Sequence, residues 1–136
     1  MKQPVISVAH CLVLWPVNDV LTFSELSNGV SMKTKGIGYD LGITPGSLTV
    51  SDKPDAKGIY SKKYTFKIPR PSAMVREKIR LLATSGMYVA TYIDDTGEQR
   101  VAGSKNYPLS LSYEYSAGVL LCTLQGKGTD ADPYTL

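Results

Sequence analysis

Apolar and polar side chains alternate almost without a break along residues 105–128. In the first half, four apolar side chains fall on one face and three polar ones on the other: Leu109, Leu111, Tyr113 and Tyr115 against Ser110, Ser112 and Glu114. A period of two residues is typical of a strand with one buried face. After a break at Ser116, Ala117 and Gly118, a second apolar run follows at 119–124. The segment therefore predicts an antiparallel β-hairpin.

Similar patterns predict strands elsewhere in the chain. Residues 5–15 are apolar on both alternating faces, which is typical of strands buried on two sides. In residues 60–69, Tyr64, Phe66 and Ile68 share one face while Lys63 and Lys67 occupy the other. Further strands are expected at 47–52, 87–94 and 98–104.

The segment "RPSAMVREKIRLLATSG" predicts the one helix of the chain. Val75, Ile79 and Leu82 follow the i, i+4, i+7 spacing of an apolar helix face. Ser72 is a good N-cap, and Gly86 can follow the helix as its C′ residue. We expect this helix to cover one face or the rim of the sheet.

These elements predict an α+β domain, mainly antiparallel β, with a sandwich or barrel-like sheet of about seven strands and one short helix. One core is expected to hold the inward-facing side chains Tyr64, Phe66, Ile68, Ile79, Leu82, Leu109, Leu111 and Tyr113. Residues 20–45 show no clear pattern beyond a turn at Asn28 and Gly29. The tail has no periodicity and almost no apolar residues, so 127–136 is predicted to be an extended C-terminal arm. Deleting 128–136 should abolish multimers while leaving a folded monomer.

The composition suits one globular domain spanning 1–136, with 43% hydrophobic and 20% charged residues. It excludes a wholly disordered chain and a membrane-spanning one, because the longest apolar run, at 5–17, is too short to cross a bilayer. No signal-peptide cleavage site follows that run, so export is not expected. Cys11 and Cys122 each lie in an apolar stretch, which predicts two buried, reduced thiols and synthesis inside a cell.

Basic residues gather between Asp52 and Arg80, where nine lysines and arginines face three acidic residues. The rest of the chain has six basic and nine acidic residues, so this segment suits contact with an acidic partner. We expect the basic strand 62–67 to lie on a different surface from the outer face of the hairpin, which lacks a protecting lysine. This part of the sheet, or the tail after Gly126, is the candidate contact for an adjacent subunit. The candidate interface residues are Lys62, Lys63, Lys67, Arg70, Ser110, Ser112, Glu114 and Tyr134.

Groups able to carry out chemistry are scarce. His10 and Cys11 are consecutive, so on a strand they point to opposite faces and cannot form a nucleophile–base pair. One histidine and two distant cysteines supply too few ligands for zinc. The acidic stretch 94–98 lacks the spacing of a calcium loop, and its residues are those that a turn with Gly97 in the left-handed conformation needs. We therefore predict no catalytic residue, cofactor or metal, and no enzymatic activity.

The order of several segments resembles that of small virion structural proteins of tailed phages and prophages of gut bacteria. The resemblance covers roughly residues 58–136, through "YSKKYTFKIPRPS", the helix, "YVATYIDDTGEQRVAGS", "YPLSLSYEY" and the closing "LQGKG" and "PYTL". It implies a tail, neck or baseplate subunit that forms a ring or tube with its own copies and other virion proteins through β-edge and arm contacts. Such a subunit is made in the host cytoplasm and located in the virion.

The alternative is a cytoplasmic, monomeric binding module that uses the basic segment 53–80 to bind an acidic protein or nucleic acid. Nucleic acid is the less favoured partner, because the aromatic residues and lysines of 60–69 fall on opposite faces and cannot cooperate. No membrane partner is expected.

Overall fold

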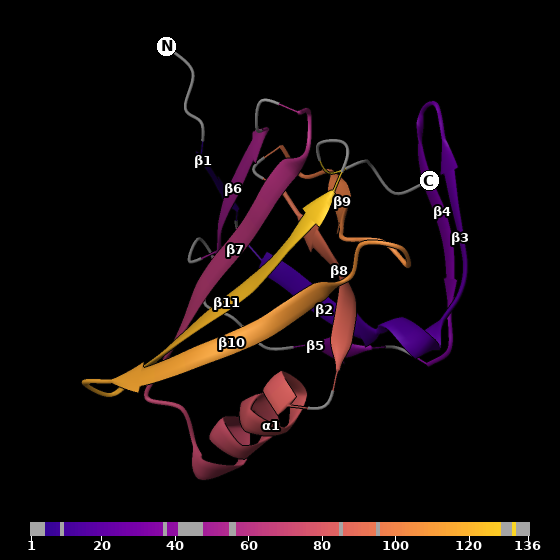
Figure 1. Ribbon diagram of the computed structural model, residues 1–136. Helices are drawn as coiled ribbons and strands as arrows, with labels where there is room; N and C mark the ends of the chain where they lie inside the picture. The colour runs from indigo at the N-terminus through magenta and orange to yellow at the C-terminus, as the bar shows by residue number, and fades with distance from the viewer. Residues whose placement is uncertain are drawn as a thin grey trace.

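The computed structural model describes residues 5–8, 10–36, 38–40, 48–54, 57–84, 86–94, 96–128 and 132, with the backbone alone at 5–8, 10, 11, 52 and 53. Strands dominate, and one α-helix accompanies them (Figure 1). In chain order the elements are β1 (Val5–Val8), β2 (His10–Pro16), the 3₁₀ turn η1 (Val17–Asp19), β3 (Val20–Leu26), β4 (Gly29–Thr34), β5 (Tyr39–Asp40), β6 (Leu48–Pro54), β7 (Tyr60–Pro69), α1 (Ala73–Thr84), β8 (Met87–Ile93), β9 (Gln99–Ala102), β10 (Leu109–Ser116) and β11 (Val119–Gly128).

Nine strands form one sheet that curls into a barrel. Its order is β1-β6-β7-β11-β10-β8-β2-β5, with β9 paired to β8, and the recorded pairings are all antiparallel. β1 lies at one end of this order and β2 near the other, yet only one residue separates Val8 from His10. Two residue steps span at most about 8 Å, so the two ends of the sheet must meet. The prediction of a mainly antiparallel sheet, barrel-like in form, with one helix is therefore confirmed.

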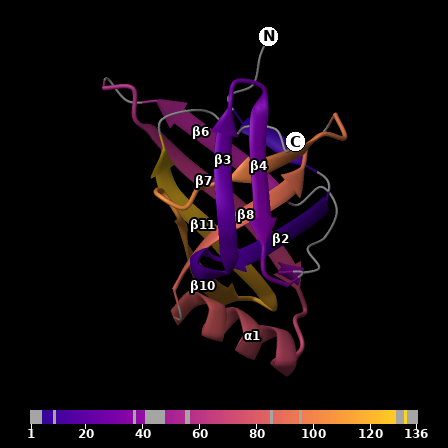
Figure 2. The same ribbon diagram turned by 90° about the vertical axis from the view of Figure 1, so that its right-hand side faces the viewer.

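The helix α1 lies across one end of the barrel and packs against β10 (Figures 1 and 2). The backbone N–H of Val75 donates to Ser72 Oγ at 3.2 Å, so Ser72 caps the helix as expected. Ile79 and Leu82 are buried in the barrel core, and Val75 packs against it. The 3.6-residue apolar stripe therefore determines which side of the helix closes the barrel.

The predicted hairpin is β10–β11, joined by a two-residue turn at Ala117 (φ 53°) and Gly118 (φ 78°). Two successive residues with positive φ are typical of a type I′ turn, whose twist matches that of the strands. Of the eight side chains expected to share one core, seven do, and the expectation for Tyr113 is wrong because its side chain is 41% exposed. β8 pairs with β10 only at Leu109 and Ser110, so Tyr113 lies beyond the point where the barrel has a strand on both sides of β10.

The segment without a clear pattern contains a second, two-stranded sheet, β3–β4, that lies over the outside of the barrel (Figure 2). A separate apolar cluster joins them: Val20, Val30, Val89 and Val101, flanked by Trp15, Phe23 and Met32. The hairpin turn falls at Ser27 and Asn28, one residue earlier than the expected Asn-Gly pair, because Leu26 pairs with Gly29. The described residues thus hold eleven strands, and the additional ones come from regions without strong alternation.

Candidate functional site

The outer surface of β7, β11 and β10 brings most of the predicted interface residues onto one face. Residues directly opposite in paired strands share a face of the sheet. The register therefore forms three rows across the three strands: Lys67–Leu121–Glu114, Thr65–Thr123–Ser112 and Lys63–Gln125–Ser110. We call these nine residues the outer polar face.

This arrangement corrects the expectation that the basic strand and the outer side of the hairpin lie on different surfaces. Lys63 and Lys67 are exposed. On β10, two strands away, Ser110 lies in the row of Lys63 and Glu114 in the row of Lys67, at about 10 Å between backbones. Glu114, also exposed, lies in the same row as Lys67. Lys127, on β11 opposite Ser61, is also exposed, so the surface has more positive than negative charge.

Arg70 lies where β7 ends beside the hairpin turn. Its backbone has a φ of 46°, and its N–H donates to the carbonyl of Gly118 at 2.8 Å. The side chain is exposed at this corner. Tyr134, the last predicted interface residue, lies outside the described residues.

Lys62 differs from the other candidates because it points into the barrel. It is only 6% exposed, on the same side of β7 as Tyr64 and Phe66. Its Nζ lies 2.7 Å from Asp132 Oδ1. The prediction of Lys62 as an interface residue is therefore wrong, since a buried, ion-paired ammonium cannot contact a partner on the outer surface.

Asp132 is the centre of a buried polar cluster. Its carboxylate accepts hydrogen bonds from Lys62 Nζ, from the Tyr64 hydroxyl at 2.6 Å and from the Tyr92 hydroxyl at 2.6 Å. Arg100 Nη1 donates to the backbone carbonyl of Asp132 at 2.9 Å. Four donors from β7, β8 and β9 thus converge on one residue that follows the last strand, and we call Lys62, Tyr64, Tyr92 and Arg100 the carboxylate socket.

This cluster also changes the boundary of the predicted arm. Residues 127 and 128 belong to β11, and Asp132 is 5% exposed and bonded to the barrel. An arm beginning at 127 is therefore wrong at its start, and for the residues after Asp132 the arm stays a prediction. The sequence contained one signal for the socket, because Lys62 is in phase with the buried Tyr64 and so needs a carboxylate partner inside the domain.

Arg100 links the socket to the turn between β8 and β9. Its Nε donates to Asp94 Oδ2 at 2.8 Å. Asp94 Oδ1 also accepts from the backbone N–H groups of Thr96 and Glu98, and Gly97 has the expected positive φ of 86°. Burial raises the pKa of Asp94, but hydrogen bonds from Thr96, Arg100 and the backbone outweigh it and lower the pKa to about 2. The turn interpretation of this acidic stretch accounts for all these contacts.

Of the histidine and the two cysteines, Cys122 is the one whose side chain the structure describes. Burial raises the pKa of the Cys122 thiol to about 12, so the reactive thiolate is scarce at neutral pH. The side chains of His10 and Cys11 lie outside the described part. Within the ranges that the structure describes, no three His, Cys, Asp or Glu side chains gather as a metal site would require. No helix in those ranges combines the length and the apolar composition needed to cross a membrane.

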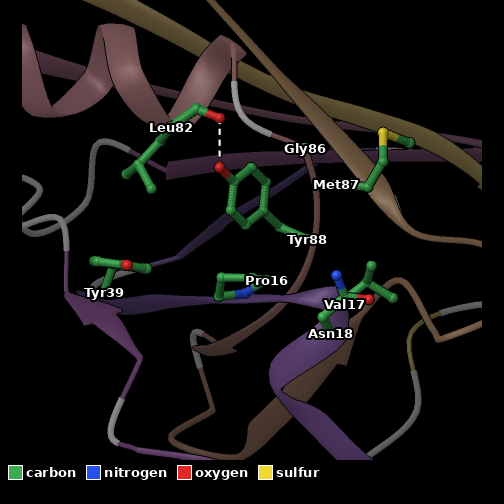
Figure 3. Close-up of a pocket in the computed structure, with 8 residues that line it drawn as sticks. All are labelled: Pro16, Val17, Asn18, Tyr39, Leu82, Gly86, Met87 and Tyr88. Carbon is green, nitrogen blue, oxygen red and sulfur yellow. Dashed lines mark hydrogen bonds between the residues drawn. The ribbon is translucent and has the colours of Figure 1, made fainter.

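A cavity of about 150 Å³ lies between the end of α1 and the start of β8 (Figure 3). Pro16, Tyr39, Met87 and Tyr88 are among its lining residues, and the Tyr88 hydroxyl donates to the Leu82 carbonyl. Small-molecule sites usually enclose about 300–1,000 Å³. This cavity is smaller, and the Tyr88 hydroxyl beside it is already bonded to the helix.

Comparison with known proteins adds no relative, since no protein-family model, curated protein or solved structure matches the chain. The function must therefore be argued from the geometry of the chain itself.

Proposed function

We propose that this chain is a non-enzymatic structural subunit of a phage tail, neck or baseplate. It would assemble with its own copies and with other virion proteins into a ring or tube, after synthesis in the host cytoplasm. The segment order of residues 58–136 supports this proposal, and the open edge of β10 is the observation that carries it.

The edge of β10 is open because β8 leaves it early. The β8–β10 pairing ends at Ser110, and no other described strand pairs with that side of β10. In a hairpin closed by a two-residue turn, the pair next to the turn is hydrogen-bonded and the pairs alternate from there. The backbone groups of Tyr113 and Tyr115 therefore point away from β11, toward the open edge.

The side chains at this edge suit a protein contact. Tyr113 and Tyr115 are 41% and 48% exposed, and the Arg76 guanidinium lies 4.9 Å from the centre of the Tyr115 ring. Tyrosine is enriched at interfaces because it combines apolar area with a polar tip. The residues that precede each of them, Ser112 and Glu114 on the outer polar face, are exposed and include no lysine to discourage a pairing strand.

Sedimentation velocity over a wide range of concentrations tests assembly directly. We expect multimers of the full chain, and we expect Tyr113→Lys to weaken them because a charge on an edge opposes strand addition. Tyr107→Lys is the matched control, since Tyr107 is 46% exposed but lies in a loop. A native chain that is monomeric at every concentration would contradict edge assembly. An equal loss of multimers in Tyr113→Lys and Tyr107→Lys would contradict it as well. Mass spectrometry of purified phage particles from an induced lysogen would then test the virion location.

The outer polar face favours the alternative of a monomeric module that binds an acidic protein. Lys63 and Lys67 are exposed there and Lys127 is exposed beside them, whereas Tyr64 and Phe66 are fully buried and cannot stack on nucleic acid bases. This alternative predicts that Lys63→Gln with Lys67→Gln weakens binding to an acidic peptide in a salt-dependent way while the chain stays monomeric.

A further inference from the structure

Six strands of the described part have one side without a pairing strand: β1, β3, β4, β5, β9 and, beyond Ser110, β10. β1, β5 and β9 contain at most four residues, so each offers few backbone groups to another chain. β4 carries the exposed Lys33, and the exposed Lys35 follows it; lysine at an edge discourages pairing. β3 has seven residues and no lysine or arginine, so it is the free edge that best matches β10.

The side chains of β3 also leave apolar area uncovered. Leu21 is 58% exposed and Leu26 is 55% exposed, the two highest values among the large apolar side chains that the structure places on strands. An unpaired strand with exposed apolar side chains is a template for a strand of another chain. In Figure 1, β3 lies on one side of the barrel and the turn of β10–β11 projects from the other, so the two free edges of one copy do not meet.

The backbone groups of the two edges match in spacing. The β3–β4 hairpin closes with a two-residue turn, as β10–β11 does, and its pairs alternate from that turn in the same way. The backbone groups of Phe23 and Glu25 therefore point to the free side of β3, as those of Tyr113 and Tyr115 do on β10. One antiparallel ladder would place Glu25 opposite Tyr113 and Phe23 opposite Tyr115, and would satisfy both edges together.

Charge distinguishes the two edges. The Arg76 guanidinium lies 4.9 Å from the centre of the Tyr115 ring, whereas the one charged residue on β3 is the exposed Glu25. Opposite residues share a face, so the ladder would bring the Glu25 carboxylate to the face that holds Arg76. Two β10 edges paired with each other would instead gather the Arg76 side chains of both copies, and like charges there oppose association.

We propose that the strand added to the open edge of β10 is β3 of a second copy, in antiparallel orientation. The proposal rests on the assembly described under the proposed function and names the surface that the β10 edge meets. Because the two edges differ, the contact runs head to tail. Each pair of copies then keeps one free β3 and one free β10, and further copies add until a ring closes or a tube grows.

Cysteine cross-linking between two full-length variants tests this contact. Glu25→Cys is mixed with Tyr113→Cys, both in a chain that carries Cys11→Ser, while Cys122 is buried. Opposite residues of a hydrogen-bonded antiparallel pair have their Cα atoms about 5.5 Å apart, which suits a disulfide. We expect a covalent dimer on a non-reducing gel after mild oxidation. Lys33→Cys mixed with Tyr113→Cys is the matched control, and it should give no dimer above the level of the parent chain.

Charge reversal gives a second readout that leaves the cysteines untouched. In sedimentation velocity, Glu25→Arg should raise the dissociation constant of the multimers at least about tenfold, and Arg76→Glu added to it should restore association. Tyr113→Cys that cross-links to itself as readily as to Glu25→Cys would show that two β10 edges pair. That result overturns the contact with β3, as do multimers that persist unchanged in Glu25→Arg, and both leave edge assembly standing. A native chain that stays monomeric at every concentration contradicts the proposed function and this contact with it.

Discussion

Replacing Asp132 with asparagine should remove the ligand that holds the C-terminal segment to the barrel. The carboxylate accepts three side-chain hydrogen bonds, and its ion pair with Lys62 has both side chains at most 5% exposed. Removing one partner of a buried ion pair costs about 3–5 kcal/mol, because the other charge is left buried without compensation. The hydrogen bonds from the two tyrosines belong to the same cluster, so their loss is not simply added. We expect Asp132→Asn to lower the free energy of unfolding by about 3–5 kcal/mol.

Equilibrium unfolding in urea, followed by circular dichroism and by fluorescence of the single tryptophan, Trp15, measures this loss. The double variant Lys62→Met with Asp132→Asn should be less destabilised than Asp132→Asn alone, since neither charge then stays buried and unpaired. A loss below about 0.5 kcal/mol in Asp132→Asn, within the range of ordinary surface substitutions, would refute the socket. On the same reasoning, removal of 129–136 should destabilise the domain, contrary to the expectation from the sequence that the fold survives it.

Three further predictions concern the turn, the thiol and the core. Because the pKa of Asp94 is about 2 in the folded protein and near 4 in an unfolded chain, its stabilisation is present above pH 4 and is lost as the pH falls through 4 to 2. The free energy of unfolding should therefore fall by about 2 kcal/mol more in the native chain than in Asp94→Asn between about pH 6 and pH 2, and parallel curves would contradict this. In a Cys11→Ser variant, Cys122 should react with a thiol reagent at pH 8 only after denaturation, because burial raises the pKa of its thiol to about 12. Rapid labelling of the native protein would show that the Cys122 thiol is accessible. Leu111→Ala should cost about 2–5 kcal/mol in urea unfolding, since Leu111 is 4% exposed in the barrel core, and a loss under about 0.5 kcal/mol would place this side chain outside it.

Local patterns were sufficient for the elements whose structure depends on near neighbours. Ser72 caps α1 through a hydrogen bond to a residue three positions away, and Gly97 and Gly118 supply the positive φ that their turns require. The two-residue period of β7 gave the correct buried side for Tyr64 and Phe66. Each of these features depends on side-chain chemistry and backbone sterics within a few residues, which the order of residues contains directly.

Pairing between distant strands decided how the surfaces combine. Lys67 and Glu114 share a row because β7 and β10 flank β11 in one register, although 46 residues separate them in the chain. A period of two assigns a residue to one side of its own strand, but it does not say which strand lies next to it or in what register. For the same reason the exposure of Tyr113 depends on where β8 leaves β10, which the alternation in β10 does not contain.

The sequence by itself therefore determined the class of fold, the helix and the hairpin, whereas Lys62 was predicted to face a partner and its inward position came from the structure. Only the tertiary structure decided which carboxylate meets that lysine. Asp132 lies 70 residues away in a segment without periodicity, and it reaches Lys62 only when the barrel places β7, β8 and β9 around one point. A buried charge requires a partner because water cannot solvate it. Desolvation specifies only the sign of that partner, and the arrangement of the strands specifies which residue it is.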